Sequence, residues 1–268
     1  MSALREIWAY RELLWSLAWR DVRIRYKQSL LGVAWAILLP LSMMLVFTFV
    51  FTRAIDARSA LNVNMPYPLY AYLGLVPWTF FAVCLSNCVN CLVANRNLVT
   101  KVYFPREVLP LAGVIAGFVD FLVALGVLVV LTVYFHLTGG WSFTWSLSIV
   151  FLPVVILVQV TMTIGIGMML AMANLFYRDV RQVFSVAIQL WMFISAVVVP
   201  VPRDGSVVAQ MIATNPMVPI IGAYRDVIAH GRWPESGPFL SAAAFAVLVL
   251  IGGWTLFRRA SFRFAECI

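Results

Sequence analysis

The residues with the clearest capacity for chemistry are cations near the start of the 268-residue sequence. Arg20, Arg23, Arg25 and Lys27 lie close together, directly before a long apolar stretch. Guanidinium and ammonium groups bind phosphates through charge and several hydrogen bonds, so the cluster is suited to a pyrophosphate headgroup. The competing interpretation is a topological signal, because cations gather at the cytoplasmic ends of membrane spans without binding any ligand.

A second charged segment, NRNLVTKVYFPRE at 95–107, lies between two long apolar runs. It must lie outside a bilayer, where another protein can bind it. Asn97 is a suitable start for a short helix that Pro105 would end. Leu98, Val102 and Tyr103 give this helix an apolar edge. Because so short a helix is marginal alone, it needs the membrane surface or a partner to pack on.

Asp120 is the one acidic residue placed well inside an apolar run. Acids at that depth are costly to bury and are therefore functional candidates. A proton carrier usually belongs to a relay, and the sequence offers no obvious basic partner inside the membrane. We therefore favour a structural hydrogen bond to a neighbouring helix over proton transport.

Other reactive groups are sparse. The sequence has no Gly-x-x-x-x-Gly-Lys-Ser/Thr loop, so this chain binds no ATP in the usual way and is not expected to be an enzyme by itself. His136 and His230 have no paired nucleophile or ligand cluster. Cys84, Cys88 and Cys91 recur at helical spacing with no His or carboxylate nearby, which favours packing over a metal site.

The composition requires a membrane to position these groups. Hydrophobic residues make up 63% of the chain and charged residues 11%, against about 45–50% and about 25% in soluble domains. The net charge of +8 comes from cations that flank apolar stretches instead of forming one patch. We therefore expect contact with anionic membrane lipids and not with nucleic acid.

The apolar pattern predicts an all-α integral membrane protein with one domain and six spans. Residues 1–29 form an amphipathic helix in the headgroup plane, either a simple anchor or an element that also meets substrate. Residues 200–239 contain six prolines and two short helical pieces, about 206–213 and 217–229, either re-entrant or on the outer surface. The predicted spans are 30–51, 69–93, 108–135, one within 145–176, 183–199 and 240–257.

The distribution of cations predicts the orientation. Fourteen basic residues fall in the N-terminus, the 94–107 and 177–182 loops and the 258–268 tail, against five on the other side. By the positive-inside rule, both termini and the 94–107 loop are cytoplasmic and residues 200–239 face outward.

Aromatic residues are dense from 67 to 81. Tyr and Trp gather at membrane interfaces, which favours an aromatic belt. Aromatic faces also suit sugar rings, so Tyr70, Trp78 and Phe81 are candidates for lining a channel.

Five sequence blocks, in order, resemble the ABC-2 type permeases that export lipid-linked polysaccharide, such as O-antigen and teichoic acid exporters. The resemblance covers nearly the whole chain. The blocks are RDVRIRYKQSLLGVAWAILLP at 20–40, YPLYAYLGLVPWTFF at 67–81, NRNLVTKVYFPREVLPLA at 95–112, YRDVRQV at 177–183 and NPMVPIIGAYRDVI at 215–228.

The resemblance implies a homodimer in the bacterial inner membrane, with a channel at the dimer interface. Two cytoplasmic ATPases would bind ATP and Mg, and the substrate would be a polysaccharide on undecaprenyl pyrophosphate. Its headgroup would meet the cluster ending at Lys27. Capsular polysaccharide or teichoic acid is an alternative substrate; an enzyme acting on lipid-linked sugars and an ATP-independent flippase are alternatives of other classes.

The resemblance also assigns two segments. Residues 95–107 would hold the coupling helix that docks in the ATPase, with Asn97, Lys101, Val102, Tyr103, Phe104 and Arg106 as docking candidates. Residues 200–236 would form external gate helices, with Pro202, Asn215, Pro216, Pro219, Tyr224 and Arg225 as gate candidates.

Overall fold

The computed structural model describes residues 3–27, 32, 34–51, 65–141, 146–201, 206–262 and 264, without the side chains of 3, 4 and 208. The predicted all-α fold is confirmed over these ranges, which hold no strand. Pro202 lies outside them, and so do residues 52–64 of the loop predicted at 52–68. The elements are α1 (Ala3–Ala9), α2 (Arg11–Lys27), α3 (Ala34–Phe49), α5 (Tyr67–Ala94), α6 (Arg96–Lys101), α7 (Val108–Leu137), η2 (Leu147–Phe151), α8 (Leu152–Phe176), α9 (Val180–Phe193), α10 (Val207–Thr214), α11 (Met217–Arg225), the π-helical η3 (Asp226–His230) and α12 (Ser236–Ser261).

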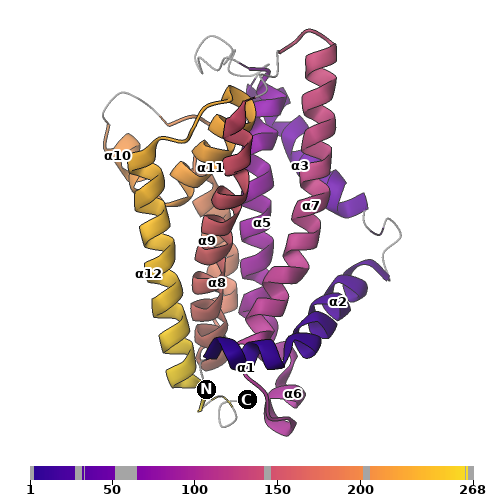
Figure 1. Cartoon of the computed structure of the whole chain (residues 1–268), viewed down its shortest axis with the longest axis vertical. Helices are drawn as coiled ribbons and strands as arrows, with labels where there is room; N and C mark the ends of the chain where they lie inside the picture. Colours follow the sequence, from indigo (N-terminus) through magenta and orange to yellow (C-terminus); the bar gives the residue numbers. More distant parts are fainter. Residues whose placement is uncertain are drawn as a thin grey trace.

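Helix α5 is the centre of the bundle. It packs between α7 and α8, and α12 packs on the far side of α8 (Figure 1). The α8–α12 contact depends on glycine, since a Cβ on Gly253 would lie 2.3 Å from the carbonyl oxygen of Gly165. Small residues of this kind let membrane helices approach backbone to backbone.

Each predicted span corresponds to a helix, but the helices differ in length. In the described part of the chain, four are long and apolar enough to cross a membrane: α5, α7, the continuous η2–α8 and α12. Helices α3 and α9 are apolar but have only 16 and 14 residues. At 1.5 Å per residue they reach about 24 and about 21 Å, short of the roughly 30 Å hydrocarbon core. Six crossings therefore remain a prediction.

The fifth span does not extend to Val199 as predicted. Helix α9 ends at Phe193, and residues 194–199 form turns in which Ala196 has a φ of 52°. A left-handed alanine is unusual, and side chains from other elements bind the carbonyls of this turn, as described below.

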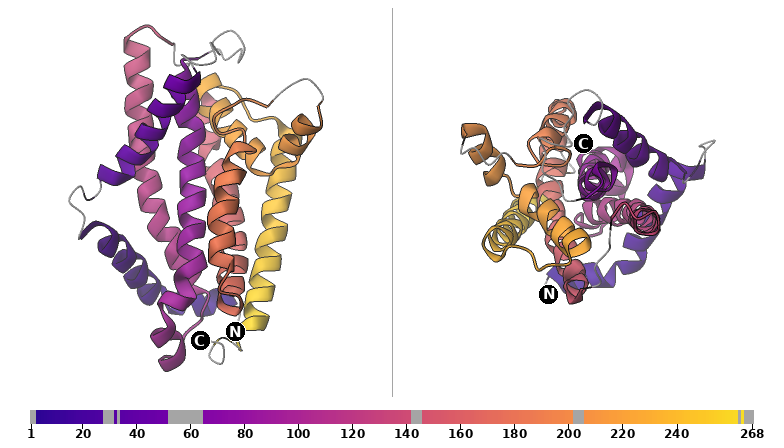
Figure 2. Two further views of the ribbon diagram at one scale, coloured as in Figure 1. Left: turned by 180° about the vertical axis from the view of Figure 1, so that it is seen from behind. Right: turned by 90° about the horizontal axis from the view of Figure 1, so that it is seen from above.

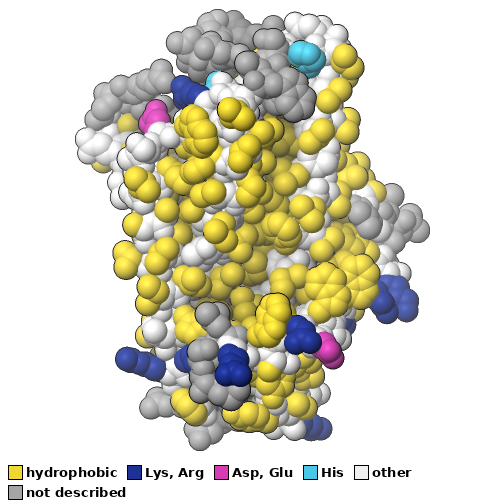
Figure 3. Space-filling model, viewed as in Figure 1, with side chains coloured by type: hydrophobic (Ala, Val, Ile, Leu, Met, Phe, Trp, Pro, Cys, Tyr) yellow, Lys and Arg dark blue, Asp and Glu magenta, His cyan; other side chains and the backbone are white. Residues whose placement is uncertain are grey.

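The two ends of the bundle differ in character. Helices α1 and α6 and the last residue of α12 lie at one end, and α10 and α11 lie toward the other (Figures 1 and 2). Figure 3 shows that most Lys and Arg side chains on its face gather toward the α1 end, below a broad hydrophobic surface. This arrangement suits a membrane protein, and the cytoplasmic placement of the α1 end stays a prediction.

Candidate functional site

The segment at 95–107 projects from the α1 end and presents one side outward. Helix α6 begins at Arg96, one residue before the predicted start. Asn95 precedes it, but its side-chain Nδ2 donates to the carbonyl of Cys91 at 2.8 Å and so binds the segment to α5. Asn97 and Lys101 are exposed, Val102 is 54% exposed and Tyr103 is 87% exposed.

The other side of this segment is part of the protein core. Phe104 is only 5% exposed and Val99 only 3%, so Phe104, one of the docking candidates, offers almost no surface to a partner in this arrangement. Both lie in a cluster that joins five other helices, with Leu17, Ala18, Cys91, Leu92, Val108, Leu109, Ala112, Met168, Ala171, Leu175, Phe257 and Phe264. A displacement of α6 would therefore act directly on the packing of the bundle.

Ionic contacts also connect the segment to α12 and α1. Glu107 is 5% exposed, and its Oε1 forms an ion pair with Nε of Arg258 at 3.1 Å. The same guanidinium donates to Glu6 at 3.3 Å, and the Arg106 guanidinium lies 5.8 Å from the ring centre of Phe264. Sequence reasoning missed this network because its members are far apart in the chain.

The basic cluster divides into paired and exposed cations. Arg20 binds Asp21 at 2.8 Å, while Arg23 and Lys27 are exposed. Arg25 donates to Asp120 and to Asn87. Asp120 therefore offsets the charge of Arg25, whereas Arg23 and Lys27 stay exposed, and a joint role of all four at an entering pyrophosphate stays a prediction.

Asp120 also has the partner that the sequence did not reveal. Its carboxylate accepts hydrogen bonds from Arg25 and from the hydroxyl of Tyr26, both in α2. The predicted structural hydrogen bond to another helix is thus confirmed, and the expectation of no basic partner is wrong. Burial and the bond to Asp120 raise the pKa of Tyr26 to about 12, so the hydroxyl keeps its proton.

The predicted gate segment forms the two expected short helices, and two of its polar candidates, Asn215 and Arg225, point inward. Asn215 binds the carbonyl of Ile194 and the hydroxyl of Ser195, both at 2.9 Å. Arg225 is 7% exposed and donates to the carbonyls of Ala196 at 2.9 Å and Val197 at 2.6 Å. These bonds satisfy backbone carbonyls of the turn that follows α9, where no helical N–H is available to them.

The other gate candidates complete this arrangement. Tyr224 is buried in the core, and its hydroxyl donates to Gln159 at 2.7 Å. Pro216 precedes α11 and Pro219 lies within its first turn, where a missing N–H costs no helical bond. Burial lowers the pKa of Arg225. The nearby Tyr70 and Tyr67 act in the opposite direction and raise it.

The candidate channel aromatics are core residues in this structure. Tyr70, Trp78 and Phe81 are 6%, 4% and 0% exposed. The Tyr70 ring lies 3.8 Å below the guanidinium of Arg225, and Trp78 and Phe81 both contact Trp191. Side chains this deeply buried within one chain have little surface with which to line a channel, so their proposed place in a channel wall does not fit this arrangement.

Comparisons with known proteins extend over nearly the whole chain. The ABC-2 type transporter family matches residues 12–229. The O-antigen export system permease protein RfbA of Myxococcus xanthus is 33% identical over 99% of this chain and 98% of its own length. A Klebsiella pneumoniae protein of the same name is 27% identical over 96% and 95%. The Escherichia coli polysialic acid transport protein KpsM is 23% identical over 89% and 90%.

Proposed function

The chain belongs to the ABC-2 type transporter family, and from this premise we propose that it is the membrane permease of an ATP-driven polysaccharide exporter. The supporting observation is its likeness, over almost its full length, to two proteins named O-antigen export permeases. We choose an O-antigen-like polymer as the first candidate substrate. The two relatives named O-antigen export permeases are more similar to this chain than the polysialic acid transport protein is. A capsular polymer is the alternative.

We propose that separate ATPase subunits bind ATP and Mg and dock on the outer side of the 95–107 segment. Tyr103 and Val102 offer exposed apolar surface at the basic end of the bundle, beside the exposed cation Lys101. The buried side, through Phe104, reaches the bundle core. This two-sided construction supports a role in transmitting ATPase movement to the membrane helices.

The proposed assembly is a homodimer in the bacterial inner membrane, with both termini cytoplasmic. The substrate would carry a lipid pyrophosphate anchor, which Arg23 and Lys27 would attract, since both are exposed. Arg25 is assigned no such role because the adjacent carboxylate of Asp120 would repel a purely anionic pyrophosphate.

Copurification tests the central claim. The full chain would be coexpressed with ABC ATPases encoded by neighbouring genes, purified, and assayed for ATP hydrolysis with lipid-linked glycans of different repeat units. A stable complex whose ATPase rate rises with one glycan class is expected. A chain that binds no ATPase, or that alters lipid-linked sugars without ATP, would contradict the proposal and favour the enzyme alternative.

A further inference from the structure

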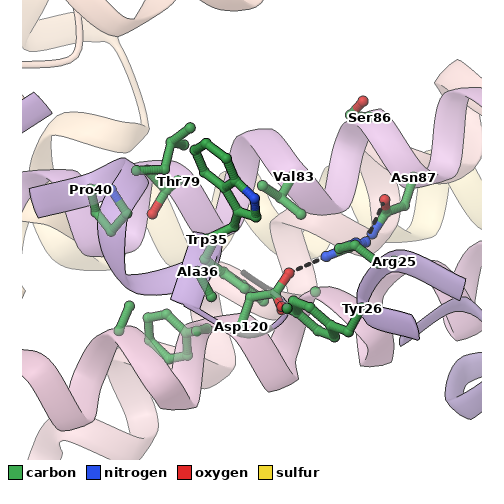
Figure 4. A pocket seen from close by; sticks show the side chains of 16 residues that line it. Arg25, Tyr26, Trp35, Ala36, Pro40, Thr79, Val83, Ser86, Asn87 and Asp120 are labelled. Carbon is green, nitrogen blue, oxygen red and sulfur yellow. Dashed lines mark hydrogen bonds and ion pairs between the residues drawn. The ribbon is translucent and has the colours of Figure 1, made fainter. Parts of the chain in front are cut away.

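A cavity of about 480 Å³ lies between α2, α3, α5 and α7. Figure 4 shows a polar group of Arg25, Tyr26, Asn87 and Asp120 toward one end, and Pro40 toward the other. Apolar side chains from α3, α5 and α7 form much of the remaining wall. The cavity is therefore amphipathic.

The charged pair in this cavity remains partly exposed. The side chain of Arg25 is 32% exposed and that of Asp120 is 18% exposed. Asp120 lies twelve residues after Val108 in the span-length helix α7, about 18 Å along the helix axis. Charges that face hydrocarbon at such depth are costly, so a polar occupant would stabilise them.

Both charged groups can form further bonds. The guanidinium has five N–H donors, and the bonds described here are to Asp120 and Asn87. The two carboxylate oxygens have about four acceptor positions, and those described accept from Arg25 and Tyr26. A ligand can therefore bind without breaking the pair.

The balance of charge selects the ligand. Arg25 and Asp120 give the lining equal positive and negative charge, so a purely anionic headgroup would be attracted by one and repelled by the other. A zwitterion satisfies both. The exposed side chains of Trp35 and Leu39, at 52% and 47%, offer an apolar surface for an attached chain.

We propose that this cavity binds one phospholipid with a phosphoethanolamine headgroup. Its phosphate accepts from Arg25, and its ammonium donates to Asp120. A phosphocholine headgroup has the charges but no N–H donor, and a phosphoglycerol headgroup has no cation. The proposal concerns a resident lipid and does not depend on which polymer is transported.

Native mass spectrometry of the purified full chain, titrated with three lipids of identical acyl chains, tests this. Phosphatidylethanolamine should bind about tenfold more tightly than phosphatidylcholine or phosphatidylglycerol, the difference expected from one charge-assisted hydrogen bond. Asp120→Asn should remove the preference. Tighter binding of phosphatidylglycerol would overturn the proposal in favour of an anion site, and equal binding of all three lipids would overturn it in favour of a site that does not read the headgroup.

A second variant keeps the proposal testable if Asp120→Asn fails to fold. Ala36 lines the cavity without joining the ion pair, so Ala36→Phe should fill the space and lose at least tenfold in phosphatidylethanolamine affinity. The matched control is Ala244→Phe on the exposed side of α12, which should bind like the unmodified chain. Full retention of the lipid by Ala36→Phe would place the lipid elsewhere and refute the site.

Discussion

Tyr103 and Phe104 are neighbours in the chain but face opposite environments. Tyr103 is 87% exposed, whereas Phe104 is 5% exposed and packs among residues of α7 and α12. The same short segment thus has a surface for a partner and an anchor in the bundle. Changes at the two positions should consequently have different effects.

Tyr103→Asp should weaken ATPase binding by about thirtyfold, because buried tyrosines at interfaces commonly contribute about 2 kcal/mol. The thermal stability of the permease alone should hardly change, since the side chain is exposed. Affinity for the ATPase and permease-stimulated ATP hydrolysis are the measurements. Phe262→Asp is the matched control, because Phe262 is 84% exposed near the same end. Equal loss in both variants would indicate general repulsion instead of docking at Tyr103.

Phe104→Ala should destabilise the permease itself by about 3–5 kcal/mol, the usual cost of removing a buried phenylalanine. A lowered unfolding temperature in detergent, measured without any ATPase, is the expected result. If Phe104→Ala unfolds like the unmodified chain but fails to bind ATPase, Phe104 must turn outward in the complex, contrary to the arrangement described here.

The sequence was sufficient to find this segment but not its orientation. Charges at both ends and a terminal proline predicted a short helix outside the bilayer, and α6 is there. Residues 102–104 follow the helix, however, so no 3.6-residue period indicates which of them faces inward. Only the burial of Phe104 in the cluster that includes residues of α7 and α12 decides that question.

Arg258→Gln should destabilise the chain by about 2 kcal/mol, because it leaves the nearly buried carboxylate of Glu107 without its ionic partner. The double variant with Glu107→Gln should recover part of this loss, since both charges are then absent. Arg259→Gln, at an exposed neighbouring position, is the control. Additive losses in the double-mutant cycle of unfolding free energies would argue against a direct interaction.

Arg225→Met should release the turn that follows α9. The variant keeps the length of the side chain but removes the donors to the carbonyls of Ala196 and Val197, at a cost of about 3 kcal/mol or more. Hydrogen exchange should rise in residues 194–199, while exchange in α12 stays unchanged. Unaltered exchange in the turn would contradict a positioning role for Arg225.

The same contacts explain why the fifth span was predicted too long. Residues 183–199 are apolar enough to continue a helix, and nothing local ends it except the approach of Pro200. The helix ends earlier because Asn215 and Arg225, 20 to 30 residues later, bind the carbonyls of Ile194, Ala196 and Val197. By contrast, the apolar runs located α5, α7, α8 and α12 well, since burial in the bundle or lipid requires the same composition.

Alkaline pH should weaken the attachment of α2 to α7 through Tyr26. Its pKa is raised to about 12 in the folded chain, first by burial and then by its bond to Asp120, whereas an unfolded tyrosine has a pKa of about 10. As pH rises between these values, the unfolded state loses the proton that the folded state retains. This contribution to stability is therefore full below about pH 10 and is lost as pH rises toward about 12. Unfolding temperatures measured across this window should therefore fall more steeply for the unmodified chain than for Tyr26→Phe, which has no proton to lose. Parallel curves would mean that the hydroxyl is not buried against Asp120 in solution.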